Sequence, residues 1–341
     1  MESDMPKRFS GINRRTALAL GAGGAFGTLA SGGAAQAQVS ASEAGSAMQT
    51  DSHPLAPGWR RFAFGNAQLT VVLDGVRSGE GPFPTFGENQ TAEAVGALMD
   101  ANALPRERFV NFFNIALLEI GDQLVVIDTG FGEGGRANGM GLLRERMASA
   151  GYEPEDVDVV ALTHLHGDHI GGLQEDGAPA FPNARYVVGR EEMAFWTSEE
   201  AKTGPRAENA LAVATKVVPF EGRMTLLADG GEVVPGITAR AAFGHTPGML
   251  AFEVDGGEGA RVLVAADTFS QFVVSFQRPE WHVRFDQDKE ASVATRRRLA
   301  ERLADESMAV MGYHLPFPGV GYVQRDGDAF RFVPETYQRL V

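Results

Sequence analysis

Cysteine is absent from the chain. Without thiols there is no disulfide framework, no lipidated N-terminal cysteine and no cysteine nucleophile. A purely structural zinc site is also disfavoured, because such sites are usually built from thiolates. Basic residues are scarce too: 30 lysines and arginines stand against 44 aspartates and glutamates, for a formal net charge of -14. This balance argues against nucleic acid and against an anionic membrane surface as partners.

What the chain does have is enough apolar material for a sizeable core. Hydrophobic residues make up 44% of its 341 positions, which excludes global disorder and allows one large or two modest domains. No internal repeat is evident, so a repeat architecture is not expected.

Residues 1–37 have the features of a twin-arginine export signal. A basic segment contains the Arg14-Arg15 pair, Ala17 to Ala30 is uncharged and rich in alanine and glycine, and Ala35-Gln36-Ala37 resembles a cleavage site. A membrane anchor is the alternative, but the run is too short and too weakly apolar for a spanning helix. The sequence therefore predicts a periplasmic or secreted protein without a membrane anchor.

The rest of the chain divides into a tether and a domain. Residues 38–58 are rich in Ser, Ala, Gly and Pro and are predicted to form a flexible linker. Residues 59–341 are predicted to form one domain. Its apolar runs alternate between hairpins and helices, which predicts two sheets sandwiched between helices. One of these helices covers residues 290–304, with Arg296, Arg297 and Arg298 partly on its solvent face.

The most informative segment is His164-Leu165-His166-Gly167-Asp168-His169, which holds three of the seven histidines. Imidazole nitrogens and a carboxylate oxygen are ligands for a divalent metal such as zinc. The apolar run 157–162 before the segment reads as a buried strand, and the glycines in and after it indicate turns. The cluster is therefore predicted on a loop at the end of a strand, where catalytic residues often lie.

Three more potential ligands follow apolar runs later in the chain: His245 follows 237–243, Asp267 follows 262–266, and His314 follows 308–313. Alone, each histidine is better read as a hydrogen-bonded core residue. Together with the cluster, they predict that several strand ends converge on one metal site.

At this point the pattern resembles the metallo-β-lactamase superfamily. The resemblance rests on the spacing of the histidine cluster, the three later ligands and Asp128-Thr129-Gly130, and it runs from about Trp59 to the C-terminus. It implies an α+β fold, a four-layer αββα sandwich. Within the superfamily the chain looks most like the methyl parathion hydrolase group, which includes lactone and aryl-ester hydrolases; the supporting segments include Phe181-Pro182-Asn183-Ala184, Gly244-His245-Thr246-Pro247-Gly248, Val283-Arg284-Phe285-Asp286 and His314-Leu315-Pro316-Phe317-Pro318-Gly319.

The resemblance implies two divalent metal ions per chain. Zinc is favoured, and manganese, iron and cobalt also accept such ligands. His164, His166 and His245 would hold the first ion, and Asp168, His169 and His314 the second. Asp267 would bridge them, and it shares the catalytic role with Asp168. A hydroxide shared by the two ions would attack the substrate. Asp128 has no ligand position and is expected to shape the site from behind.

The expected substrate is a small ester, lactone or organophosphate, with a lactone or carboxyl ester as the preferred natural substrate. Aromatic residues near the motifs are predicted to line its pocket, although core packing is the alternative for each of them: Phe131, Trp196, Phe269 and Phe317. The oligomeric state stays open, and a homodimer is one option.

Several other functions compete with this one. An acyl-homoserine lactonase would share the ligands, but many such enzymes carry a tyrosine soon after the bridging aspartate, where this chain has Thr268-Phe269-Ser270; Tyr322 is a candidate substitute. A zinc β-lactamase is disfavoured because it commonly has a cysteine in place of Asp267. A di-iron redox enzyme is disfavoured because no flavin-binding segment is evident. A non-catalytic binding protein on the same fold is disfavoured because all seven ligands are present.

Overall fold

The computed structural model describes residues 57–336. The predicted export signal lies outside the described residues, as does the predicted linker apart from its last two positions. Between residues 57 and 336, no helix combines the length and the apolar character needed to cross a membrane.

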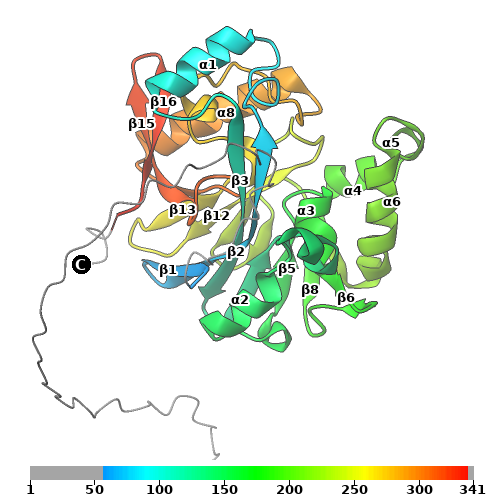
Figure 1. Cartoon of the computed structure of the whole chain (residues 1–341). Coiled ribbons are helices and arrows are strands. Elements are labelled where there is room, and N and C mark those ends of the chain that lie inside the picture. The colour runs from blue at the N-terminus through cyan, green and yellow to red at the C-terminus, as the bar shows by residue number, and fades with distance from the viewer. Residues whose placement is uncertain (1–56, 337–341) are drawn as a thin grey trace, which may run out of the picture. The chain divides into compact units, whose positions relative to one another are not determined.

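Two seven-stranded sheets form the centre of the fold (Figure 1). The first sheet has the strand order β1 (Trp59–Phe64), β2 (Ala67–Glu80), β3 (Arg108–Ile120), β4 (Gln123–Ile127), β5 (Val159–Ala161), β8 (Arg185–Gly189) and β9 (Met224–Leu227). The second has the order β10 (Glu232–Val234), β11 (Ile237–Ala241), β12 (Leu250–Asp255), β13 (Arg261–Val264), β14 (Ala309–Met311), β15 (Val320–Asp326) and β16 (Ala329–Pro334). A small separate ribbon pairs β6 (Gln174–Glu175) with β7 (Ala178–Pro179).

Helices cover the outer face of each sheet. On the first sheet lie α2 (Leu143–Ala150), α4 (Arg190–Trp196), α5 (Glu199–Thr203) and α6 (Ala207–Lys216). On the second lie α7 (Val274–Gln277) and α8 (Lys289–Asp305). The remaining helices are α1 (Ala92–Ala101), which packs on the segment around Trp281, and the short α3 (Gly167–Ile170).

Successive side chains of the central strands point into different hydrophobic cores, on opposite faces of the sheet. On β4, Leu124 and Val126 face the helices of the first sheet, whereas Val125 and Ile127 face the second sheet. Successive side chains on a strand point to opposite faces, so a strand buried on both faces reads as a continuous apolar run. A third core lies between the second sheet and α8. The three cores separate four layers, which confirms the predicted αββα sandwich.

Parallel pairing brings the ends of several strands to one edge. β4 pairs in parallel with β5 in the first sheet, and β13 pairs in parallel with β14 in the second. The carboxyl ends of parallel neighbours lie side by side, so the residues that follow them meet. Asp128 follows β4, the histidine cluster follows β5, Asp267 follows β13 and His314 follows β14; His245 lies in the connection from β11 to β12.

The exposure predicted for helix 290–304 is wrong at one residue. α8 covers this segment, but Arg296 is only 1% exposed. Its guanidinium donates to the carbonyl oxygens of Pro279 and Trp281 at 2.8 and 3.1 Å and pairs with Asp286 at 2.9 Å. Helical spacing places Arg296 on the face that packs against the second sheet, and its buried charge is stable there because it is paired and hydrogen-bonded.

A carboxylate between three arginines joins α8 to the second sheet. Glu253 on β12 is 6% exposed and contacts Arg240 at 2.7 Å, Arg302 at 2.9 Å and Arg261 at 3.2 Å. Burial alone would raise the pKa of Glu253, but the bonds from Arg302 and Arg240 outweigh it and lower the pKa to about 2.

Because the folded-state pKa of Glu253 lies below its ordinary value, its contribution to stability is present at neutral pH and is lost as pH falls toward about 2. We expect Glu253→Gln to lower the free energy of unfolding by about 1–2 kcal/mol at pH 7, after discounting for solvent around the arginines. Urea unfolding at pH 7 and pH 3 should show the difference shrinking at the lower pH. Glu306→Gln, at a more exposed carboxylate that pairs with two of these arginines, Arg261 and Arg302, is the control and should cost less. A difference independent of pH would contradict this account.

Candidate metal centre

Three histidine nitrogens meet at the end of β5. The Nδ1 atom of His166 lies 3.0 Å from the Nε2 atoms of both His164 and His245. His164 and His245 are almost completely buried. These residues, the first ligand group, can each offer one nitrogen to a common point, since the atoms lie within 4.8 Å of one another.

A second ligand group consists of Asp168, His169 and His314, whose atoms also lie within 4.8 Å of one another. The Oδ2 atom of Asp168 is 3.7 Å from the Nε2 atoms of both histidines. Tyr313 supports this group, because its ring stacks on His169 with centroids 3.9 Å apart and its hydroxyl donates to the Asp168 carbonyl at 2.6 Å.

Asp267 connects the two groups. Its Oδ1 atom lies 3.3 Å from Nε2 of His169, and its Oδ2 atom lies 3.1 Å from Nε2 of His314 and 3.3 Å from Nε2 of His245. Its carboxylate thus contacts members of both ligand groups. Burial would raise the pKa of Asp267, but the neighbouring histidines outweigh it and hold the pKa well below its usual range.

Oxygen atoms behind the ligands fix which ring nitrogen carries the proton. The Nδ1 atoms of three histidines face acceptors: His169 faces Asp128 at 2.8 Å, His245 faces Asp286 at 2.9 Å and His314 faces the Phe112 carbonyl at 2.9 Å. A carbonyl or carboxylate oxygen can only accept, so Nδ1 donates and the Nε2 lone pair of a neutral ring points into the site.

The proton position on His164 is fixed in a similar way, by the hydroxyl of Thr163. Thr163 donates its hydroxyl to Asp128 at 2.8 Å, so its oxygen is left to accept from Nδ1 of His164 at 3.1 Å. Asp128 therefore serves two ligands, His164 through Thr163 and His169 directly. This position fits the expectation that Asp128 shapes the site from behind. Its φ of +62° is a conformation that few non-glycine residues adopt.

The residues present fit two bound cations. Nε2 of His169 and Oδ1 of Asp267 are buried and have no hydrogen-bond partner in the part of the chain that the structure describes. Burial, followed by neighbouring histidines, holds the pKa values of His164 and His166 well below the ordinary value. These two neutral imidazoles and the ionised Asp267 suit a divalent metal. At His169 and His314, burial lowers the pKa but neighbouring carboxylates outweigh it and raise the pKa, so a metal bound there would displace a proton.

Glu192 on α4 holds the loops of the first ligand group together. Its Oε1 atom accepts from the backbone N–H of Leu165 at 2.9 Å and from the Trp196 indole at 2.6 Å. Its Oε2 atom accepts from the Thr246 hydroxyl at 2.6 Å and from the Gly248 N–H at 3.0 Å. One buried carboxylate therefore ties the loop that carries His166 to the loop that follows His245. Sequence reasoning missed this residue, because a glutamate in a helix gives no sign of what it faces.

The ligands open into a cavity of about 930 Å³. Of the four predicted pocket residues, only Phe131 lines it. Trp196 is buried in the core between α4 and the first sheet, Phe269 stacks on Phe276 in the core under the second sheet, and Phe317 packs against the core between the sheets. The other aromatic residues in its walls are Phe83, Phe86, Phe109, Phe113 and Phe285; of these, the sequence pointed only to Phe113, which lies near a motif segment.

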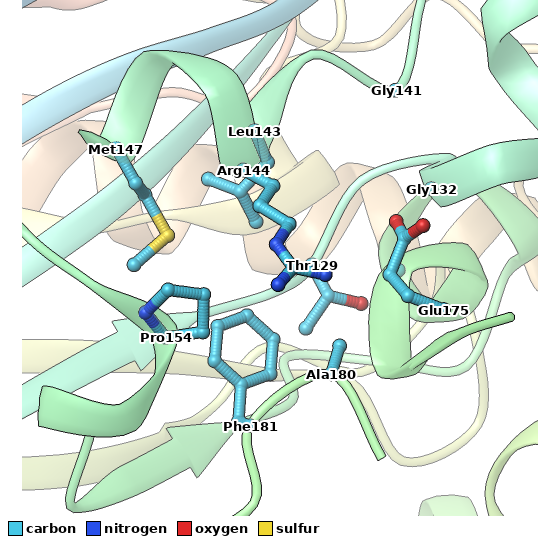
Figure 2. A pocket seen from close by; sticks show the side chains of 11 residues that line it. Thr129, Gly132, Gly141, Leu143, Arg144, Met147, Pro154, Glu175, Ala180 and Phe181 are labelled. Atoms are coloured by element: carbon cyan, nitrogen blue, oxygen red, sulfur yellow. The ribbon is translucent and has the colours of Figure 1, made fainter. Parts of the chain in front are cut away.

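A second hollow lies behind the histidine loop, near Thr129 and Gly172 (Figure 2). It encloses only about 10 Å³ between Leu143, Met147 and Phe181, with the Arg144 side chain across it. A space of that size holds one water at most. The larger cavity is therefore the candidate site for a substrate.

The contacts of Glu192 generate a test. We expect Glu192→Gln to weaken zinc binding by roughly 10- to 100-fold, because the amide presents an N–H₂ group to donors and the two ligand-bearing loops lose their common acceptor. Competition with a chromophoric chelator measures the affinity. Glu191→Gln changes the exposed neighbour on the same helix and should leave it unaltered. Equal affinities of the two variants would show that Glu192 does not position the ligands.

Comparisons with known proteins show the family and the fold. The sequence model of the metallo-beta-lactamase superfamily matches residues 110–306. The chain is 29% identical over 164 residues to an N-acyl homoserine lactonase of a Bacillus species, an alignment that covers 48% of this chain and 58% of that protein. It is 30% identical over 112 residues to the uncharacterized protein YobT of Bacillus subtilis (strain 168), covering 32% and 45%. The chain thus spans about half the length of these curated relatives.

Solved structures share the whole fold. The dizinc quorum-quenching lactonase AidC, in complex with a product, has a TM-score of 0.75 at 23% identity, and the hydrolase AbOPH of the beta-lactamase superfamily has a TM-score of 0.73 at 27% identity. Each comparison covers 82% of this chain and 98% of the other. With the family model matching more than half of its residues, the chain belongs to the metallo-beta-lactamase superfamily.

Proposed function

We propose that the chain is a dinuclear metal-dependent hydrolase that cleaves esters, lactones or phosphotriesters. The observation that carries the proposal is the placement of Asp267 between two groups of inward-facing ligands. A carboxylate shared in this way holds two cations close together. The cavity next to the ligands provides room for a small organic substrate.

Each ligand has a part in the proposed reaction. The two ions, with zinc favoured, would supply an activated water and would polarise the attacked oxygen. His164, His166 and His245 would hold one ion, and the second ligand group the other. Among the ligand carboxylates, Asp168 is the more exposed, at 23% of its side chain, and it lines the cavity. We therefore assign to Asp168 the transfer of a proton from the reacting water to the leaving oxygen.

The substrate class is the finer part of the proposal. The phenylalanines in the cavity wall suit an apolar acyl or aryl group. The likeness to AbOPH and the segments around residues 181, 244 and 314 support a place near the methyl parathion hydrolase group. The natural substrate that we favour is a lactone or carboxyl ester.

An acyl-homoserine lactonase is the second candidate, and the similarity to the Bacillus lactonase favours it. The tyrosine expected near the bridging aspartate has no counterpart in the cavity wall, where the described residues include no tyrosine. Tyr322, the candidate substitute, packs against the core between the sheets. A lactonase built on this chain would have to orient its substrate without that hydroxyl.

We expect the purified protein to bind about two divalent ions per chain and to hydrolyse members of a panel of lactones, aryl esters and phosphotriesters. Removing the metal with a chelator should abolish turnover, and adding zinc back should restore it. His166→Ala should lose at least about 100-fold in kcat/KM, because the first ligand group then has two members.

His282→Ala is the matched control, since His282 lies outside both ligand groups and pairs with Glu290 at 3.4 Å. This variant should keep its metals and its rate. Two bound metals without turnover of any panel member would favour the non-catalytic binding protein, and full activity of His166→Ala would refute the mechanism.

We also propose that residues 1–37 direct export of the protein through the twin-arginine route to the periplasm or beyond. The support is the Arg14-Arg15 pair ahead of the uncharged Ala17 to Ala30 segment. Replacing both arginines by lysine should leave unprocessed protein inside the cell, as measured by fractionation and blotting. Replacing Lys7 and Arg8 by Arg and Lys is the control for charge. Normal export of the double-lysine variant would rule the route out.

A further inference from the structure

We propose that the natural substrate carries an anionic group and that Arg206 binds this group beside the first ligand group. The inference rests on the proposed hydrolase function and specifies its substrate class: an amphipathic ester or lactone with a carboxylate or similar anion. It assigns a specificity-determining role to a residue outside the metal ligands.

The position of Arg206 relative to the metal ligands is fixed by its own helix. Arg206 immediately precedes α6, and Asn209 follows three residues later on the same helix face. Asn209 donates its side-chain amide to the Leu165 carbonyl at 2.8 Å, inside the histidine cluster. Arg206 and Asn209 both line the cavity together with His166. Arg206 therefore lies near the loop that carries His166, and its positive charge contributes to lowering the pKa of that histidine.

Arg206 has no counterion among residues 57–336, where its side chain makes no ion pair and no hydrogen bond. Two other arginines of the second half of the chain, Arg296 and Arg302, do have one: Arg296 pairs with Asp286 and Arg302 with Glu253, each at 2.9 Å. Burial lowers the pKa of the Arg206 guanidinium, and no carboxylate contributes an opposing effect. Burying a cation without a partner costs free energy in the empty site, and binding of an anion would offset that cost.

The other charged groups of the cavity also favour an anionic substrate. Arg77 and Arg284, both exposed, are further cations in the wall, and Glu80, also exposed, is the only lining carboxylate apart from the proposed metal ligands. The ligand carboxylates Asp168 and Asp267 would be offset by the bound ions. With those ions bound, the three arginines against Glu80 would give the cavity a net positive charge in a chain of net charge -14, which would favour anions.

Phenylalanines border the second ligand group. Phe113 is in edge contact with the His314 ring, with centroids 5.3 Å apart, and with Phe131 at 4.8 Å. The second ligand group thus borders phenylalanines, whereas the first borders Arg206. A substrate with its reacting bond at the metals would place an apolar part toward Phe113 and an anionic part toward Arg206.

The test compares two esters that differ in one charge, 4-acetoxybenzoate and its neutral methyl ester, on the zinc-loaded full chain. Each kcat/KM is divided by the rate of hydroxide hydrolysis of that ester, which corrects for leaving-group reactivity. We expect a preference of about tenfold or more for the anion, which falls to less than about threefold in Arg206→Gln. Arg206→Lys, which keeps the positive charge, should retain part of the preference for the anionic ester.

A binding measurement gives a second readout. Calorimetry should show that 4-hydroxybenzoate binds the wild type about tenfold more tightly than it binds Arg206→Gln, whereas methyl 4-hydroxybenzoate binds the two proteins equally. Arg77→Gln is the control for the general field of the cavity and should reduce the anion preference less than Arg206→Gln does. Zinc content and thermal unfolding of each variant establish that it is folded and loaded.

The outcomes separate the inference from the proposed function. If zinc-loaded wild type hydrolyses neither these esters nor any compound of the panel, the function fails, and the calorimetry still decides whether Arg206 binds anions. A preference for the neutral ester, or an anion preference that survives in Arg206→Gln, overturns the inference and leaves the hydrolase intact. An equal loss in Arg77→Gln also overturns it, because the preference would then belong to the cavity as a whole.

Discussion

The constraint on which the site depends is the close approach of histidine nitrogens and a carboxylate in a buried space. Nitrogen atoms of His164 and His245 approach His166 to 3.0 Å, and the carboxylate of Asp267 lies within 3.3 Å of three imidazole nitrogens. Without a cation, such an arrangement leaves two buried atoms, Nε2 of His169 and Oδ1 of Asp267, without a hydrogen-bond partner in the part of the chain that the structure describes. The fold keeps it together from behind, because the acceptors that hold Nδ1 of the ligands also prevent the rings from turning away.

These supporting acceptors tie the site to the first sheet and to both helix layers. Asp128 follows β4 and holds ligands that follow β5, so it acts between neighbouring strands of the first sheet. Asp286 joins His245 to Arg296 on α8, and thereby connects the site to the helix layer behind the second sheet. Glu192 does the same from α4 on the opposite side. The backbone also takes conformations that are rare for non-glycine residues, at Asp128 and at Ala266 directly before Asp267. Packing of both sheets must stabilise those conformations.

The sequence predicted the metal ligands because each potential ligand directly follows an apolar run. Strands buried on both faces appear as apolar runs, and ligands placed directly after them can be located from the order of residues alone. Side-chain direction is not encoded in the same way. Trp196 and Phe131 both lie near motif segments, yet Trp196 turns into the core to donate to Glu192 while Phe131 faces the cavity. Glu192 and Arg206 gave no signal, because their roles depend on loops distant in sequence that the fold brings against them. Arg296 was placed partly toward solvent because an arginine in a helix is usually exposed, and its buried partner Asp286 lies outside that helix.

The division between ligands and walls explains why family membership says little about the substrate. The family match spans residues 110–306, which include six of the seven proposed ligands and exclude only His314. Much of the cavity wall comes from residues 77–86 on and after β2, which precede that match, together with Phe109 at the start of β3. The long β2–β3 ribbon can therefore change its side chains without disturbing the strand ends that hold the ligands. Arg206 lies within the matched segment but contributes no ligand atom, so its side chain can also change without removing a metal ligand. Activation of water and selection of the substrate are thus carried by different parts of the chain.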